Sequence, residues 1–166
     1  MGQTEAQGHS QGQADILIRE VTVTDVPALL RLRRRMFQDL GYCETALLDA
    51  SDAASRDYLA EAIPSGEFHA WLAVTLQGQV VGSGGVVIDR HPPSPMNLDG
   101  RIGYIMSLVT EPAYRHLGIA RHLMQTILRW LQEQGVRSVS LHASEQGCQL
   151  YRELGFSESH EMRLRT

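Results

Sequence analysis

Hydrophobic positions along the chain follow two different periods, and their alternation predicts a mixed α/β protein. Short runs of mostly or alternately apolar residues are typical of strands, whereas apolar residues recurring every three or four positions are typical of helices. Three consecutive strands in the middle of the chain indicate that part of the sheet is antiparallel. We predict strands over residues 16–21, 69–76, 80–89, 101–110, 136–143 and 161–165, and helices over 26–40, 45–63, 118–134 and 144–154.

Turn and cap residues mark where these elements begin and end. Thr24-Asp25 resembles a helix cap, with Pro27 in the first turn that follows. Ser51-Asp52 predicts a break or second cap within the next helix, and Pro64-Ser65-Gly66 is expected to close it. The glycines of the 80–89 strand either weaken it or let another group approach closely. We expect the strand at 136–143 to lie inside the sheet.

Length and composition are those of one globular domain. The first fourteen residues are rich in Gln and Gly and predict a disordered tail, so we place the domain at residues 15–166. Two cysteines make no disulfide framework and favour a reduced, cytoplasmic setting. Cys and His do not fall at metal-site spacings, so no metal is expected. No apolar run is long enough to predict a membrane partner.

The charge pattern narrows the possible functions further. A net charge of −4 argues against the electrostatic attraction on which non-specific nucleic-acid binding depends. The chain has no lysine, which excludes a Walker A phosphate loop and Schiff-base chemistry. The first helix carries four arginines within five residues: Arg31, Arg33, Arg34 and Arg35. They indicate either a solvated helix face or a patch that steers a phosphate-bearing cofactor.

The segment 107–121, SLVTEPAYRHLGIAR, carries the most specific signal in the chain. Pro112 ends a strand, an R-x-x-G-x-A turn runs from Arg115 to Ala120, and an amphipathic helix opens near Gly118. The first N–H groups of that helix have no partner within it, and the helix dipole is positive there. The turn therefore predicts a backbone site for an anion such as a pyrophosphate.

A second block follows about twenty residues later and completes a family resemblance. It contains Ser144 and Gly147 and ends in the string LYRELGF at residues 150–156. With the R-x-x-G-x-A turn, it resembles the GNAT superfamily of acetyl-CoA-dependent N-acetyltransferases, over essentially residues 16–165. The resemblance implies the GNAT fold, a central mixed and mostly antiparallel sheet flanked by helices. It also implies acetyl-CoA (coenzyme A) as cofactor.

The resemblance assigns roles to individual residues. The main-chain N–H of Leu108 would stabilise the developing oxyanion, and Tyr151 would protonate the leaving CoA thiolate. The main chain near Thr110 would align the pantetheine arm like an added strand. Together, the cofactor-binding residues that the resemblance implies are Leu108, Val109, Thr110, Arg115, His116, Leu117, Gly118, Ile119, Ala120, Arg121, Ser144 and Tyr151.

The sequence departs from the family pattern at three positions. Ser144 replaces Asn and Gly147 replaces Ala, both small or polar exchanges. Tyr104 stands where some members have a Glu on the fourth strand, which leaves the general base open. The remaining candidates are Glu111, His69, His91 and His142. Cys148 would permit an acyl-cysteine route, but the resemblance favours direct transfer.

Two functions remain in view. The first is an N-acetyltransferase that moves the acetyl group of acetyl-CoA to a primary amine of a small molecule or to a protein α-amine. The second is a non-catalytic acyl-CoA-binding module, a sensor or assembly partner. The expected partner is therefore a small-molecule or peptide amine, and a homodimer is left open. A dinucleotide-binding oxidoreductase does not fit, because the glycine pattern and strand order are wrong.

Overall fold

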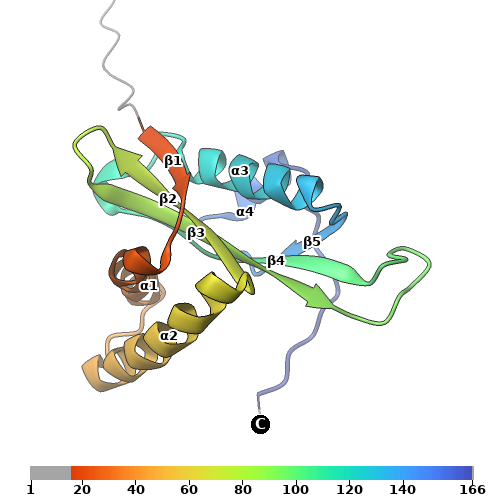
Figure 1. Cartoon of the computed structure of the whole chain (residues 1–166), viewed down its shortest axis with the longest axis horizontal. Coiled ribbons are helices and arrows are strands. Elements are labelled where there is room, and N and C mark those ends of the chain that lie inside the picture. The colour runs from red at the N-terminus through yellow and green to blue at the C-terminus, as the bar shows by residue number, and fades with distance from the viewer. Residues whose placement is uncertain (1–15, 166) are drawn as a thin grey trace, which may run out of the picture.

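A single five-stranded sheet organises the protein (Figure 1). The computed structural model describes residues 16–165, so the predicted tail over residues 1–14 lies outside the described residues. The strands lie in the order β1-β2-β3-β4-β5, with β1 to β4 antiparallel and β5 parallel to β4. Their bounds are Ile16–Glu20 (β1), Phe68–Thr75 (β2), Val80–Arg90 (β3), Arg101–Thr110 (β4) and Ser138–Leu141 (β5).

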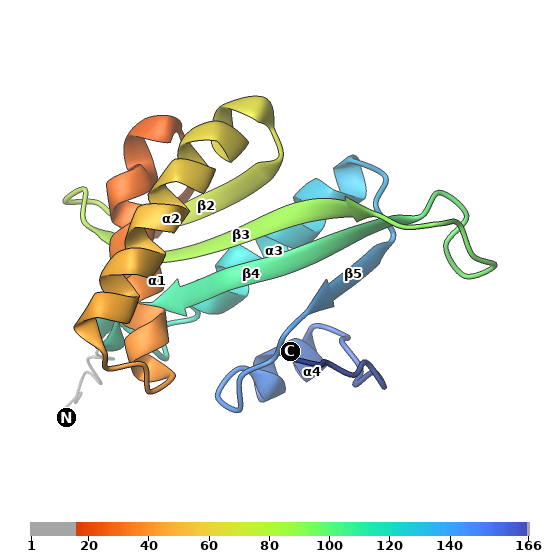
Figure 2. The ribbon, with the colours of Figure 1, turned by 90° about the horizontal axis from the view of Figure 1, so that it is seen from below.

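Helices cover both faces of the sheet and enclose two hydrophobic clusters (Figures 1 and 2). The helices α1 (Val26–Asp39) and α2 (Thr45–Ser65) pack on one face, where Leu32, Leu59 and Leu72 are buried. The helix α3 (Ile119–Glu133) lies across the other face, and α4 (Cys148–Glu153) packs into the same cluster as α3. No helix within residues 16–165 is long and apolar enough to span a membrane.

Close approach explains the glycines of β3. A Cβ atom at Gly84 would lie 2.9 Å from Cδ1 of Ile127 on α3, and one at Gly85 would lie 2.3 Å from Cζ of Phe68 on β2. A side chain at either position would overlap the neighbouring group. Of the two predicted roles, these two glycines therefore serve close packing on opposite faces of the strand.

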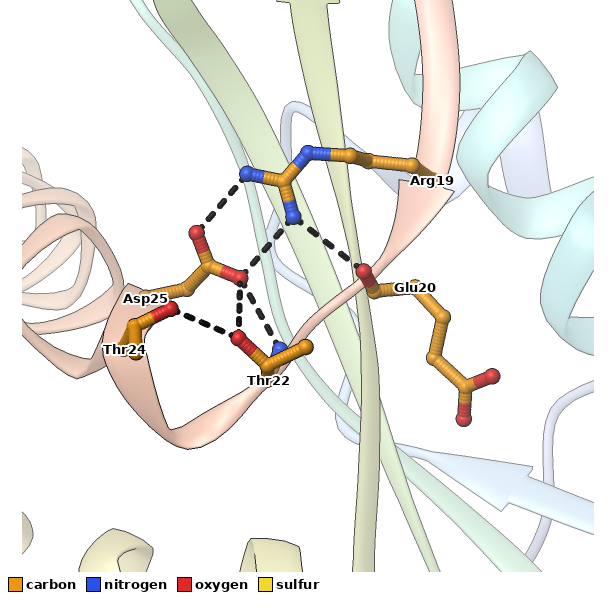
Figure 3. A network of polar contacts seen from close by, with 5 residues as sticks. All are labelled: Arg19, Glu20, Thr22, Thr24 and Asp25. Carbon is orange, nitrogen blue, oxygen red and sulfur yellow. Dashed lines mark hydrogen bonds and ion pairs between the residues drawn. The ribbon is translucent and has the colours of Figure 1, made fainter.

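Asp25 connects β1 to α1 through a polar network rather than through a simple cap (Figure 3). Its carboxylate accepts two hydrogen bonds from the guanidinium of Arg19, at 2.8 and 2.7 Å, and one from the N–H of Thr22 at 2.9 Å. The Arg19 hydrogen bonds lower the pKa of Asp25 to about 2, against the opposing effect of burial. Asp25 is the N-cap residue of α1, but its side chain bonds backward along the chain instead of to the first turn of α1.

Three predicted features of the secondary structure are wrong. The helix α2 runs without a break through Ser51-Asp52, and the Asp52 carboxylate accepts a hydrogen bond from Arg34 at 2.6 Å instead of capping a new helix. Within the described chain, β5 lies at the sheet edge rather than inside it. Residues 161–165 form no strand; Met162 and Leu164 are 94% and 87% exposed, so no apolar burial repays the cost of ordering them.

Candidate active site

The strands β4 and β5 begin as neighbours and then diverge (Figure 2). They pair only where Ile102–Ile105 of β4 faces Ser138–Leu141 of β5. Beyond Ile105, the outer edge of β4 has no strand partner within residues 16–165. The main chain from Met106 to Thr110 is therefore available on that side to pair with another molecule.

A β-bulge lies in β4 at this opening. The register with β3 shifts between Ser83 and Gly85, so that Ser107 and Leu108 together oppose Gly84. Ser107 is only 8% exposed and has a φ of 55°, a left-handed conformation that is uncommon for a residue other than glycine. The Ser83 hydroxyl donates to the carbonyl of Ser107 at 3.4 Å, and Arg33 donates to the Ser107 hydroxyl. These two side chains hold the bulge in place.

The bulge and the pairing that follows it set the direction of the β4 amides. The N–H of Glu111 donates to the carbonyl of Val81 on β3 at 2.8 Å. Because N–H groups alternate sides along a strand, the amides of Thr110 and Leu108 face away from β3, toward the opening. The Thr110 carbonyl faces the same way, since it accepts a hydrogen bond from Nε of Arg115 at 3.1 Å.

The turn after β4 brings the start of α3 to the same place. Pro112–Tyr114 form one turn of 3₁₀ helix, and α3 begins at Ile119, one residue after the predicted start. Gly118 is its N-cap with a φ of 79°, and His116 also has a positive φ, 63°. The exposed loop 116–118 leads directly to the unpartnered N–H groups and positive dipole end of a fifteen-residue helix. This geometry fits a pyrophosphate held by main-chain donors.

The arginine side chains of the turn bind neighbouring carboxylates. Arg115 bonds to Asp39 at the end of α1, and Arg121 in the first turn of α3 bonds to Glu153 of α4. These ion pairs link the turn to the helices on both sides. What the loop presents to a ligand is therefore mainly backbone, since the two arginines already have partners.

Tyr151 lies on α4 and packs against the α3 cluster. Its ring meets Phe156 edge to face, with centroids 6.1 Å apart. A Cβ atom at Gly147 would lie only 2.6 Å from the Tyr151 ring, so the glycine makes room for the tyrosine. Burial raises the pKa of Tyr151, and the nearby Cys148 raises it further. The phenol therefore remains protonated at neutral pH. Ser144 accepts a hydrogen bond from the N–H of Gly147 at 3.3 Å and so shapes the turn before α4.

The structure separates the four candidate bases. Glu111 bonds to Arg31. His69 stacks on Trp130 with ring centroids 4.3 Å apart, and its Nδ1 lies 3.1 Å from Glu20. His91 follows β3 at the end of the sheet remote from the bulge. His142 is exposed and follows the last residue of β5, at the opening.

Neither interpretation of the four arginines of α1 describes them fully. Arg31, Arg34 and Arg35 each bind a carboxylate, of Glu111, of Asp49 and Asp52, and of Asp39 respectively. Arg33 instead reaches the bulge on β4. Its helical spacing from Leu29 and Phe37, four residues on either side, is the sequence signal that places it on the inward face.

The sequence and fold of this chain match those of known proteins. The family model described as "Acetyltransferase (GNAT) family" matches residues 27–156. The chain belongs to the GNAT acetyltransferase family. Its mixed, mostly antiparallel sheet and flanking helices match the fold of solved GNAT structures, so the expected family and fold are both confirmed.

Individual relatives show how far the likeness reaches. A GCN5-related N-acetyltransferase from Ralstonia eutropha JMP134 is 28% identical, with a TM-score of 0.83 over 91% of this chain and 98% of that one. A predicted acetyltransferase from Clostridium acetobutylicum, solved with acetyl-CoA, is 24% identical, with a TM-score of 0.82 over 91% and 96%. Glucosamine 6-phosphate N-acetyltransferase of Trypanosoma brucei brucei is 30% identical over 89 residues, 53% of this chain and 57% of that protein. The match thus spans little more than half of that relative.

Proposed function

We propose that this GNAT protein is an N-acetyltransferase that moves the acetyl group of acetyl-CoA directly to a primary amine. The observation that carries the proposal is that the free edge of β4 after its bulge leads to the N-terminus of α3, and that the Arg121–Glu153 ion pair links this end of α3 to α4, the helix that carries Tyr151. Family membership and the Clostridium structure with acetyl-CoA support the choice of cofactor. The trypanosomal relative, named for an amino sugar phosphate, supports a small-molecule amine as acceptor.

Different segments of the chain bind different parts of acetyl-CoA. Backbone N–H groups of the 115–121 turn hold the pyrophosphate, and Gly118 allows the main chain to approach it. The main chain over Leu108, Val109 and Thr110 aligns the pantetheine arm as an added strand, through the outward groups of Leu108 and Thr110. Ser144, in the turn before α4, is the remaining cofactor-binding residue that we propose. When bound, acetyl-CoA supplies an acetyl group activated as a thioester.

The same residues carry the chemistry. With acetyl-CoA bound, the amine nitrogen would bond to the acetyl carbon and lose a proton to a base, and the carbon–sulfur bond would break to release the thiolate. The N–H of Leu108, fixed by the bulge, donates to the carbonyl oxygen as negative charge develops there. Tyr151 then gives its proton to the departing thiolate, a step that requires the protonated phenol which its environment maintains. His142 is the candidate base that the fold leaves at the opening.

Replacing Tyr151 by Phe tests this assignment. The change keeps the ring and its contact with Phe156 and removes only the proton donor. We expect kcat to fall about 10²–10⁴-fold, with the KM for acetyl-CoA nearly unchanged, because the proton is needed only as the thiolate leaves. The measurement is thiol release from acetyl-CoA with a panel of amines.

The control is Tyr114→Phe, which removes a hydroxyl that bonds to Gln79 instead. An equal loss of acetyl-CoA affinity in Tyr151→Phe would show that Tyr151 binds or packs rather than acting as an acid. Tight acetyl-CoA binding without thiol release from any amine would favour the non-catalytic module.

A further inference from the structure

A small cavity lies on the α1–α2 face of the sheet, behind the bulge. Its volume is about 70 Å³, and α1, α2, β2 and β4 all contribute to its wall. Met106, which lines it, directly precedes the bulge residue Ser107. The cavity therefore reaches β4 from the face opposite α3. The lining residues are Arg33, Ser55, Tyr58, Leu59, Phe68 and Met106.

Arg33 is the one charged residue in this wall, and most of its donors have no protein partner. Among residues 16–165 its only hydrogen bond goes to the hydroxyl of Ser107, and its buried Nε has none. A guanidinium has five N–H donors, so four remain. The other three arginines of the same helix all bind carboxylates. Arg33 thus presents unused donors at the wall of the cavity, where it is partly buried.

The surroundings neutralise this cation only in part. Burial lowers the pKa of Arg33, while the negative charge of Asp52 acts in the opposite direction. The carboxylates of Asp52 and Asp49, however, both accept hydrogen bonds from Arg34 and not from Arg33. The Phe37 ring lies 5.3 Å from the guanidinium carbon and adds a cation–π contact. Because a partly buried charge without a full partner carries a desolvation cost, a ligand of opposite charge would offset that cost.

We propose that Arg33 binds an anionic group of the acceptor, so that the substrate is an amine which also carries a carboxylate or a phosphate. This inference rests on the proposed function and names the class of acceptor. Arg33 lies at the bulge whose Leu108 amide faces the reacting carbonyl. An anion on Arg33 would hold the amine of the same molecule close to that point. Guanidinium donors match carboxylate and phosphate oxygens equally well, so either group fits the chemistry.

Matched pairs of acceptors test the proposal and distinguish the two anions. One pair is an amino acid and its carboxamide, and the other is an amino sugar with and without a phosphate. We expect wild-type protein to prefer the anionic member of one pair in kcat/KM. In Arg33→Gln, the ratio of kcat/KM for the anionic member to kcat/KM for the neutral member should fall about 10- to 150-fold, the effect of losing a charged hydrogen bond. Any loss that is equal for both members reports instead the contact of Arg33 with the bulge. Arg33→Lys should recover part of the preference.

Two further variants separate specificity from a structural role. Arg35→Gln removes a paired arginine from the same helix and should leave the preference unchanged. Ser55→Asp places a carboxylate in the cavity wall and should weaken the anionic acceptor without altering Arg33. Equal loss of kcat for both members of each pair would instead mean that Arg33 only supports the bulge. Wild-type protein without preference for an anion would overturn the proposal.

If the protein does not transfer acetyl groups, the experiments give a different result from the one expected if only the anion site is wrong. In that case no amine releases thiol, and calorimetric titration with the same acceptor pairs still reports on Arg33. Binding of an anionic amine that is lost in Arg33→Gln would support the anion site. Equal binding of all four compounds by both proteins would contradict it.

Discussion

Replacing Gly147 by Ala should displace Tyr151, the proposed general acid, without changing its phenol group. The added Cβ would lie 2.6 Å from Cε2 of Tyr151, 2.9 Å from Cζ and 3.0 Å from the hydroxyl oxygen. The backbone itself accepts alanine, since Gly147 has a φ of −86° and a ψ of −19°. The methyl group therefore acts almost entirely on the tyrosine ring. We expect the protein to remain folded with Tyr151 shifted.

The size of the shift follows from these distances. Ordinary contact begins at 3.4 Å, so the ring must move by about 0.8 Å, the difference between 3.4 and 2.6 Å. A misplacement of about 1 Å can cost about 10²-fold in rate, because proton transfer depends on the position of the hydroxyl. That factor corresponds to about 2.7 kcal/mol of activation free energy. Acetyl-CoA affinity should change little, because the main-chain donors on β4 and α3 are untouched.

A double-mutant cycle with Tyr151→Phe makes the test specific. In the Phe background there is no acid to displace, so Gly147→Ala should lower kcat little further. Gln149→Ala, at an exposed position of the same short helix, serves as the control. The measurements are kcat and KM by thiol release, together with thermal unfolding. Wild-type kcat in Gly147→Ala, or fully additive losses in the double mutant, would refute the reasoning.

Two other predictions concern the cofactor turn and the β1–α1 connection. Gly118→Ala should lower the free energy of unfolding by about 1–2 kcal/mol, because the φ of Gly118 is 79°. Gly118→Glu should in addition abolish CoA binding in calorimetry, while circular dichroism shows a retained fold. Unchanged CoA affinity in the Glu variant would contradict the phosphate site. Asp25→Asn should cost about 1–2 kcal/mol at pH 7, less than the full linkage value because Arg19 is 40% exposed. Since the folded-state pKa is depressed, this contribution is present above pH 3.8 and disappears as pH falls through about 2, so chemical denaturation of both proteins should converge there.

The sequence by itself determined those features of this protein that depend on residues close together in the chain. The R-x-x-G-x-A turn was predictable because Pro112 ends a strand, Gly118 adopts a left-handed φ, and apolar residues then recur at helical spacing. The bounds of β3 and β4 were predictable to within a residue for the same reason. The family pattern pointed to Tyr151, and its pKa and packing agree with that assignment without testing it.

Tertiary structure alone decided what lies next to what across the sheet. The sequence marks Asp52 as a candidate helix cap, yet its carboxylate accepts a hydrogen bond from Arg34 of another helix. The sequence places Arg33 in a charged run, yet its side chain reaches the β4 bulge. Gly147 gave no sign that it faces Tyr151, and the candidate bases could not be ranked until the β4–β5 opening was seen to lie beside His142. These contacts join residues distant in the chain or depend on side-chain packing. No local periodicity encodes them, because burial and charge pairing are set by the assembled fold.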